Sequence, residues 1–442
     1  MFFKRKGMIL VPFILLLLLL TACDMLEMEV INDEWVINIH RSDNIGGTKV
    51  DVLYDIIETA DGNFVAVGQS FSDDGGISDN YGYSDVWVVK FTKTGSILWN
   101  MNYGGSDNDV GRAIIQSDDG GYVVAGYTKS ADEDVQNNQG KNDYWIFKLD
   151  ANGNQKWENT FGGTEDDYAF DLCETTDGGY VLAGRTESID GDVTGFKGME
   201  DAWIVKVDDM GDWVWKKTLG GTQTDRAYSI CPTDDDGFLI AGMSDSSDGD
   251  VTANKGESDG WLVKVDFWGT YIWDKNYGGT ETDEARSISR TADNGFIVAG
   301  QTYSTDQEAL GNHGNSDGWV VRVDSNGDLK WSNCYGGTSS DEIWSIIETS
   351  TGGYAFLGVS QSSDGDVPDN LGSYDFLFML LDEYGNIEWS KNYGGTFSEI
   401  GNSIIENTDG DYVLGGNTYS TDGNVSGNNG LSDCWVLQLR QQ

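Results

Sequence analysis

A pair of adjacent glycines returns along this chain at an unvarying interval of 58 residues. Seven copies occur with no insertion or deletion between them, at Gly46-Gly47, Gly104-Gly105, Gly162-Gly163, Gly220-Gly221, Gly278-Gly279, Gly336-Gly337 and Gly394-Gly395. A fixed period of this size is typical of a repeat architecture, in which each unit packs on its neighbours. The period therefore predicts seven equal units, and it overrides the several unrelated domains that a length of 442 residues would suggest.

One repeat contains four short runs with the composition of β-strands. In the third copy these runs are Tyr168–Cys173, Tyr180–Gly184, Trp203–Val207 and Trp213–Lys217, and Asp177-Gly178-Gly179 forms a hairpin turn between the first two. No helical periodicity interrupts them. Four strands per unit and seven units predict an all-β fold, a seven-bladed β-propeller made of four-stranded antiparallel blades.

The two ends of the repeat region are complementary. The last copy stops at Arg440 after its third strand, while the segment before the first Gly-Gly pair offers one unpaired strand, Trp35–Ile39. We expect this strand to complete the last blade and close the ring, because closure removes exposed sheet edges. One position does not fit, since the repeat predicts Trp at position 41 and Arg41 is there.

Two tryptophan positions recur in nearly every repeat. They are Trp87, Trp145, Trp203, Trp261, Trp319 and Trp435 in the third strand and Trp99, Trp157, Trp215, Trp273, Trp331 and Trp389 in the fourth. We interpret them as packing between blades, although tryptophans can also stack on sugars. Trp213, Trp268 and Trp344 depart from the pattern, and we expect Trp213 and Trp268 to be exposed candidates for ligand contact.

The first residues form a separate segment. A basic start at Lys4-Arg5-Lys6 precedes the apolar run Met8–Leu20, which is too short for a comfortable membrane span. The ending Leu20-Thr21-Ala22-Cys23 resembles a bacterial lipoprotein box, which implies cleavage before Cys23 and attachment of lipid to its sulfur. An ordinary signal peptide with an incidental cysteine is the alternative.

These features define the expected organisation of the chain. Residues 1–22 are a lipoprotein signal peptide, 23–33 are the lipidated cysteine with a short tether, and 34–442 are the propeller. The predicted location is the cell envelope of a bacterium, on the extracytoplasmic side, with the lipid bilayer as partner of the anchor.

The balance of charge is strongly acidic, with 74 Asp and Glu residues against 27 Lys and Arg and a net charge of −47. Such a surface repels nucleic acid and attracts cations, basic partners or neutral ligands that form hydrogen bonds. We therefore expect a protein or glycan ligand and no nucleic acid. Solubility outside the cell would explain the same acidity without a ligand.

Residue types that common catalytic sites require are scarce. The chain has two histidines, His40 and His313, at different places in the repeat, too few for a Ser-His-Asp triad or a His-rich metal site. The cysteines after Cys23, which are Cys173, Cys231, Cys334 and Cys434, are scattered. Cys173 and Cys231 hold equivalent places in adjacent repeats, too far apart to bridge, so we expect buried thiols.

The turn between the third and fourth strands carries a motif with a known counterpart. In the stretch Asp150-Ala-Asn-Gly153-Asn-Gln-Lys-Trp157, an Asp is followed by a Gly and then by a Trp, and other copies share the Gly and Trp. This pattern resembles the tryptophan-docking repeat of quinoprotein-like propellers. The resemblance implies the architecture, and some lipoproteins of that kind act as envelope assembly scaffolds. The adjacent cysteine pair common in quinoprotein dehydrogenases is missing, so no cofactor follows.

An acidic residue follows every Gly-Gly pair. These turn carboxylates are Asp51, Asp109, Asp167, Asp225, Asp283, Asp341 and Glu399. If the strand that follows is innermost, they ring the mouth of a central channel and could attract cations or hold a ligand. The alternative is a structural role, in which each carboxylate accepts backbone N–H groups of its turn.

A second acidic set lies in the long loop between the second and third strands. Three copies place aspartates at relative positions 1, 3 and 12, a partial match to calcium-binding loops: Asp190, Asp192 and Asp201; Asp248, Asp250 and Asp259; Asp364, Asp366 and Asp375. Calcium is thus the one cofactor that the sequence suggests. Turns stabilised by Asp side chains are the alternative explanation.

Two classes of function follow. In the first, the protein is a non-catalytic binding or scaffold protein that uses an acidic loop face, because near-identical blades offer no distinct catalytic constellation. In the second, it is a hydrolase or lyase acting on polysaccharide through paired carboxylates. The second class needs acids that differ from their repeat equivalents, and only Glu399 and Glu308 do so visibly.

Overall fold

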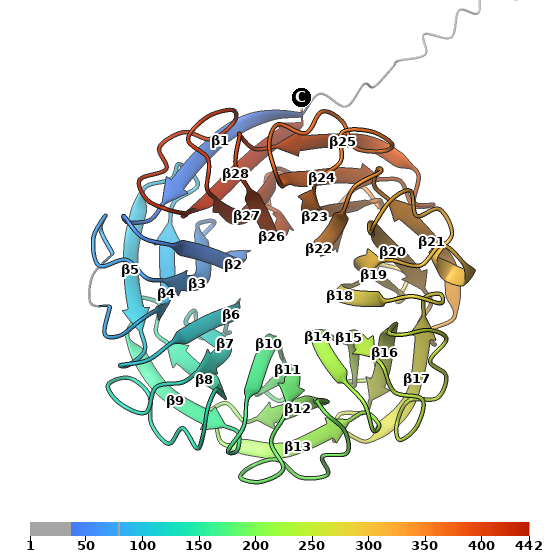
Figure 1. Ribbon diagram of the computed structural model, residues 1–442. Coiled ribbons are helices and arrows are strands. Elements are labelled where there is room, and N and C mark those ends of the chain that lie inside the picture. Colours follow the sequence, from blue (N-terminus) through green and yellow to red (C-terminus); the bar gives the residue numbers. More distant parts are fainter. Residues whose placement is uncertain (1–36, 78–79, 442) are drawn as a thin grey trace, which may run out of the picture. The chain divides into compact units, whose positions relative to one another are not determined.

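The computed structural model describes residues 37–77 and 80–441. The signal peptide and the lipidated Cys23 with its tether, predicted at 1–22 and 23–33, lie outside the described residues, as does Trp35. The unit Ile37–Gln441 consists of seven four-stranded sheets arranged around a central axis (Figure 1). The predicted seven-bladed, all-β propeller is therefore confirmed.

The first three blades follow one another without interruption. Blade 1 contains β2 (Asp51–Glu58), β3 (Phe64–Ser70), β4 (Asp85–Phe91) and β5 (Ile97–Tyr103). Blade 2 contains β6 (Asp109–Gln116), β7 (Tyr122–Thr128), β8 (Asp143–Leu149) and β9 (Gln155–Phe161). Blade 3 contains β10 (Asp167–Glu174), β11 (Tyr180–Thr186), β12 (Asp201–Val207) and β13 (Trp213–Leu219).

The next three blades repeat this order. Blade 4 contains β14 (Asp225–Pro232), β15 (Phe238–Ser244), β16 (Asp259–Val265) and β17 (Tyr271–Tyr277). Blade 5 contains β18 (Asp283–Arg290), β19 (Phe296–Thr302), β20 (Asp317–Val323) and β21 (Leu329–Tyr335), with a short 3-10 helix η1 (Gln307–Ala309) in its long loop. Blade 6 contains β22 (Asp341–Glu348), β23 (Tyr354–Ser360), β24 (Asp375–Leu381) and β25 (Ile387–Tyr393).

Blade 7 joins the two ends of the propeller. Its own strands are β26 (Glu399–Glu406), β27 (Tyr412–Thr418) and β28 (Asp433–Gln441), and its outermost strand is β1 (Ile37–Ile45) from the start of the described chain. Strand β1 pairs antiparallel with β28, as Figure 1 shows in blue beside red. The predicted closure by an N-terminal strand is correct, and within the described residues this strand continues past the predicted end at Ile39 to Ile45.

Arg41 takes the place that Trp holds in the fourth strand of blades 1 to 6. It pairs with Gln438 on β28, as Trp157 pairs with Lys148 in blade 2. Its guanidinium lies 5.5 Å from the centre of the Phe91 ring of blade 1 and donates a hydrogen bond to the Thr92 carbonyl. The repeat phase was therefore right, and a cation–π contact replaces tryptophan packing at the joint.

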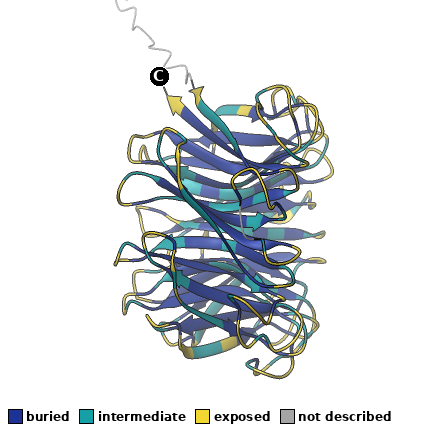
Figure 2. Ribbon diagram, turned by 90° about the vertical axis from the view of Figure 1, so that its left-hand side faces the viewer, coloured by how far each residue is buried: buried dark blue, intermediate teal, exposed yellow. Residues whose placement is uncertain are grey.

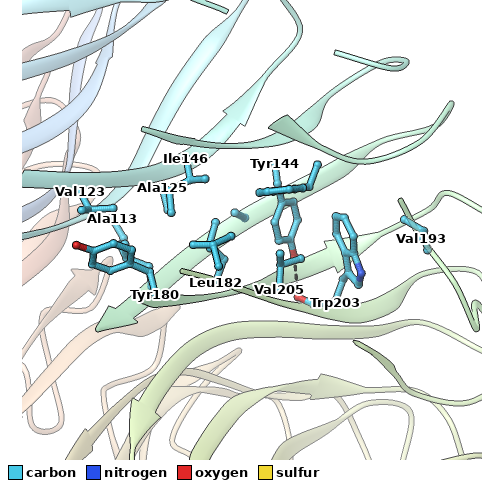
Figure 3. Close-up of a cluster of buried hydrophobic side chains, with 14 residues drawn as sticks. Ala113, Val123, Ala125, Tyr144, Ile146, Tyr180, Leu182, Val193, Trp203 and Val205 are labelled. Carbon is cyan, nitrogen blue, oxygen red and sulfur yellow. Dashed lines mark hydrogen bonds between the residues drawn. The ribbon is translucent and has the colours of Figure 1, made fainter. Parts of the chain in front are cut away.

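The recurring third-strand tryptophans pack between neighbouring blades. Trp203 is completely buried in a cluster formed by strands of blades 2 and 3 (Figure 3). The Tyr144 hydroxyl of blade 2 donates a 2.8 Å hydrogen bond to the Trp203 carbonyl, so the interface also has a directional contact. Burying a side chain of this size in every blade except blade 6, where Leu377 takes the place, holds adjacent blades together.

A β-bulge recurs in the innermost strand of every blade. In β10 the pairing with β11 passes from Ala169 opposite Gly184 to Asp171 opposite Ala183, which leaves Phe170 unpaired. A Cβ atom on Gly184 would lie 1.9 Å from the Tyr168 carbonyl oxygen, so this close approach requires glycine. The bulge gives each blade one extra residue beside the central axis, and these residues form the site described below.

Candidate functional site

The turn carboxylates are completely buried in all seven blades. In blade 3, Asp167 accepts hydrogen bonds from the Gly163 amide at 2.9 Å and from the Ser188 hydroxyl at 2.8 Å. Glu399 accepts the equivalent bond from the Gly395 amide at 2.8 Å and another from the Thr418 hydroxyl at 2.7 Å. The structure thus places these carboxylates inside the turns that precede the innermost strands, where they satisfy backbone donors.

The first acid of each long loop is bound to the Gly-Gly turn of the same blade. Asp190 accepts a 2.9 Å hydrogen bond from the Thr164 amide, and Asp248 and Asp364 accept the equivalent bonds from Thr222 and Thr338, each at 2.8 Å. These bonds hold the two connections together on one face of the propeller, which we call the loop face. They also occupy the oxygens that a calcium ion would need.

The second acid of the calcium pattern is paired with lysine in two of the three copies. Asp192 contacts Lys216 at 2.5 Å, and Asp250 forms an ion pair with Lys197 of the preceding blade. For Asp366 the hydrogen bonds are made by its backbone amide, which donates to the Gly336 carbonyl at 2.9 Å. Within residues 37–77 and 80–441, no group of three or more His, Cys, Asp or Glu side chains is arranged to hold a metal ion.

The aspartate that ends each long loop is the first residue of the third strand. We call this set the closing carboxylates: Asp85, Asp143, Asp201, Asp259, Asp317, Asp375 and Asp433. One oxygen accepts an amide four residues earlier, as the Gln139 amide donates to Asp143 Oδ2 at 2.7 Å. The other oxygen, Oδ1, is buried in all seven and has no hydrogen-bond partner in the part of the chain that the structure describes.

Each closing carboxylate faces a turn carboxylate of the next blade. Asp143 Oδ1 and Asp167 Oδ2 both lie within 2.8 Å of the position that a Cβ atom on Gly162 would take. Burial, together with the negative charge of Asp167, raises the pKa of Asp143 to about 7. Two carboxylates that share one buried space cannot both ionise cheaply, so the closing position carries a proton well above the usual range for aspartate.

The central axis holds a cavity of about 360 Å³. It is lined by the bulge residue and the residue after it from every innermost strand. The bulge residues differ from blade to blade, and we call them the channel set: Tyr54, Arg112, Phe170, Tyr228, Arg286, Trp344 and Asn402. A polar cavity of this size with convergent side chains is where a small ligand is expected to bind.

The residues after the bulge form an inner belt of hydrogen bonds. Its members are Asp55, Ala113, Asp171, Ser229, Ser287, Ser345 and Ser403. In every member except Ala113, one side-chain oxygen accepts an amide from the innermost strand of the next blade, as Asp55 Oδ2 accepts Ile114 at 3.0 Å and Ser287 Oγ accepts Ile346 at 3.3 Å. The belt satisfies N–H groups that an innermost strand would otherwise leave unpaired.

One blade has no oxygen in this belt. Ala113 cannot accept from blade 3, and the Leu172 amide instead donates to Asp171 Oδ1 of its own blade at 2.8 Å. The other oxygen, Asp171 Oδ2, accepts the Ile230 amide at 2.9 Å and the Ser229 hydroxyl at 2.8 Å. Burial raises the pKa of Asp171 to about 6, while these hydrogen bonds act in the opposite direction.

Two arginines of the channel set lie between aromatic rings. The Arg112 guanidinium is 4.2 Å from the Tyr54 ring centre and 5.6 Å from that of Phe170. The Arg286 guanidinium is 5.8 Å from the Tyr228 ring centre and 4.3 Å from that of Trp344. Ring faces on both sides hold a guanidinium in position while leaving its in-plane N–H groups available for hydrogen bonds.

The sequence analysis did not single out the channel set as a site, although it noted Trp344 as a departure. The signal that could have found the set is a position where the 58-residue step is kept while the residue changes in every repeat. Trp213 and Trp268 are 58% and 68% exposed, as expected. The four cysteines are buried and free, also as expected.

Apolar side chains are exposed on the loop face of several blades, and Figure 2 shows that exposed residues concentrate in the connections between strands. Exposed examples are Tyr83, Ile189, Met199, Tyr303, Leu310, Leu371, Phe397, Tyr419 and Leu431, all in the long loops or the Gly-Gly turns. Phe397 and Tyr419 line a hollow of about 350 Å³ with Ser373, Thr396 and Ser398. Among the described residues, no helix is long and apolar enough to cross a membrane.

Comparison with known proteins agrees on the fold. No protein-family model matches this chain. A segment of 174 residues, 37% of the chain, is 28% identical to the regulatory protein FlaEY of Caulobacter vibrioides, and the match covers 18% of that protein. The chain thus corresponds to a small part of this curated relative.

Solved structures resemble the propeller over most of its length. The Pan2 WD40 domain of Neurospora crassa has a TM-score of 0.51 at 10% identity, covering 92% of this chain and 96% of that domain. A protein of unknown function from Dyadobacter fermentans has a TM-score of 0.46 at 11% identity, covering 92% and 99%. Identities this low bear on the fold alone.

Proposed function

We propose that this protein is a non-catalytic binding protein of the bacterial cell envelope, held on the extracytoplasmic side of a membrane by lipid on Cys23. In this proposal the loop face binds a protein partner that carries basic residues. The observation that supports the proposal is the set of exposed apolar side chains on that face, in a chain whose net charge of −47 favours basic partners.

The loop face has the features of an interaction surface. Ile189, Met199 and Leu431 are 75%, 67% and 67% exposed. Apolar side chains exposed to this degree lower solubility, so they favour a partner that covers them. The hollow beside Phe397, which is 60% exposed, offers a place for one anchoring side chain of a partner. The surrounding carboxylates would attract a basic partner and speed its approach.

Glu399 and Glu308, the two acids that differ from their repeat equivalents, make structural contacts. This favours a binding role over catalysis. Glu399 keeps the turn contacts of the aspartates it replaces. Glu308 contacts Lys255 of the preceding blade at 2.6 Å, as Asp250 pairs with Lys197. A polysaccharide hydrolase needs a free acid and a free base near one another, and these acids are engaged with other groups. The partial match to a regulatory protein agrees with a role in binding.

The partner proposal can be tested with paired surface variants of the full chain. Protein and glycan arrays are probed with the wild type, with a loop-face variant, Phe397→Ser, and with Trp268→Ser on the opposite face as control. We expect binding to a basic protein that Phe397→Ser weakens roughly tenfold and Trp268→Ser leaves unchanged. Binding to glycans alone, or hydrolysis of any polysaccharide on the array, would contradict the proposal.

The anchor is tested separately. Mass spectrometry of the mature protein is expected to find acyl groups on an N-terminal Cys23, and Cys23→Ala is expected to release the protein from membranes. Recovery of an unmodified N terminus from the wild type would show that the segment is an ordinary signal peptide.

A further inference from the structure

The channel set contains buried hydrogen-bond donors that the protein leaves open. Arg112 Nε, Arg286 Nε and Trp344 Nε1 are buried and have no partner among the described residues. All three belong to residues that line the same central cavity. A buried donor without an acceptor costs stability, and three such donors in residues around one cavity favour a ligand that supplies acceptors.

The carboxylate acceptors of the cavity wall, in contrast, are already occupied. Asp55 accepts the Ile114 amide at 3.0 Å and the Ser403 hydroxyl at 2.9 Å. The oxygens of Asp171 are likewise held by backbone amides and by Ser229. These carboxylates therefore have little capacity to accept further hydrogen bonds from a ligand.

The two arginines differ in how far their charge is compensated. Arg286 contacts Glu284 of its own strand at 2.9 Å. For Arg112, no ion pair or hydrogen bond is found within the described residues. Its charge interacts with that of Asp55, whose oxygens are engaged in the belt. Arg112 is thus a largely unneutralised cation in the middle of an acidic protein, which makes it the main anchor for an anion.

From these observations we propose that the central channel binds a small organic oxyanion, a carboxylate or a phosphate ester, through the in-plane N–H groups of Arg112 and Arg286. The aromatic rings on either side of each guanidinium hold it in place before the ligand arrives, which lowers the entropic cost of binding. A cavity of about 360 Å³ limits the ligand to a small molecule. The site is separate from the loop face and does not depend on the function proposed there.

The proposal is tested by calorimetry on the full chain with citrate and with inorganic phosphate as probes and glycerol as a neutral control. We expect binding of at least one anion and none of glycerol, and the tighter anion shows whether carboxylate or phosphate is preferred. Arg112→Gln removes the charge and is expected to weaken binding roughly tenfold to a hundredfold. Arg112→Lys keeps a positive charge without the planar guanidinium. Its affinity is expected to lie between those of the wild type and Arg112→Gln.

A matched control outside the channel is Arg290→Gln, because Arg290 pairs with Asp234 and does not line the cavity. It should bind as the wild type does. If Arg112→Gln fails to fold, Arg286→Gln takes its place, with a melting curve as the check. Equal affinity in the wild type and the channel variants, or no heat from either anion, would overturn the proposal and show the arginines to be packing elements of the channel.

Discussion

The Gly-Gly turns and the channel set use the same seven-fold scaffold in opposite ways. In the turns, one carboxylate recurs in every blade, and each copy is buried and hydrogen-bonded to its own turn. In the channel, one position carries Tyr, Arg, Phe, Trp or Asn according to the blade, and three buried donors there have no partner among the described residues. In this protein the residue that is repeated in every blade stabilises the fold. The position that varies between blades is the one at which we propose that a ligand binds.

The two positions differ because only the turn position has a neighbouring backbone amide that needs a hydrogen-bond acceptor. Every turn exposes the same amide to the interior, so every blade needs the same acceptor. A bulge residue at the channel has no neighbour that requires a particular side chain, since the inner belt already satisfies the strand edge. Such a position is free to change, and the seven copies together can form an asymmetric site.

The largest expected effect is on a repeated, buried position. Trp203→Ala should lower the free energy of unfolding by about 3–5 kcal/mol, because it opens a cavity between blades 2 and 3. Urea denaturation followed by tryptophan fluorescence measures the change. The matched control is Trp213→Ala, which removes a 58% exposed tryptophan and should cost less than about 1 kcal/mol. If Trp203→Ala and Trp213→Ala lowered the free energy of unfolding by similar amounts, the repeated tryptophans would have no special role in stability.

A smaller effect, on pH dependence, is expected at the closing carboxylates. Burial raises the pKa of Asp143 to about 7 in the folded protein, above that of the unfolded chain. Its contribution therefore favours the fold below about pH 4 and is lost as the pH rises through about 7. Asp143→Asn does not titrate, so we expect this variant to lose less stability than the wild type between about pH 5 and pH 8.

Melting temperatures across this pH range test the prediction. Asp369→Asn, a change at an exposed aspartate of the blade 6 loop, serves as the control and should follow the wild type. If Asp143→Asn shows the same pH dependence as the wild type, the closing carboxylate does not carry the proton that its buried, unpartnered oxygen indicates.

The smallest expected effect on stability is at the channel set. Arg112→Gln removes two cation–π contacts and no hydrogen bond, so it should change the free energy of unfolding by less than about 1 kcal/mol. The same denaturation experiment measures it. A loss as large as that of Trp203→Ala would show that the channel residues are structural, and it would remove the contrast between the two regions.

The sequence was sufficient for the parts of the fold that are local or repeated. The strands, the hairpin turns and the seven-fold count follow from short-range patterns. The closing strand was predicted as well, but at Trp35–Ile39, and the mismatch at position 41 left its register open. The sequence could not predict that Arg41 would stack on Phe91, because these residues meet only when the ring closes. It also left the role of the aspartates open, since an Asp in a turn looks the same whether it binds a backbone amide or a calcium ion.

By itself, then, the sequence determined the architecture, because a 58-residue step with four strand patterns per copy has few ways to bury its apolar faces. Only the tertiary structure decided which polar residues remain available to bind a ligand. Arg112 and Arg286 lie three repeats apart in the chain, and they line one cavity because the bulge in each innermost strand directs one residue to the common axis. Convergence of this kind depends on closure of the whole ring, which no local pattern encodes.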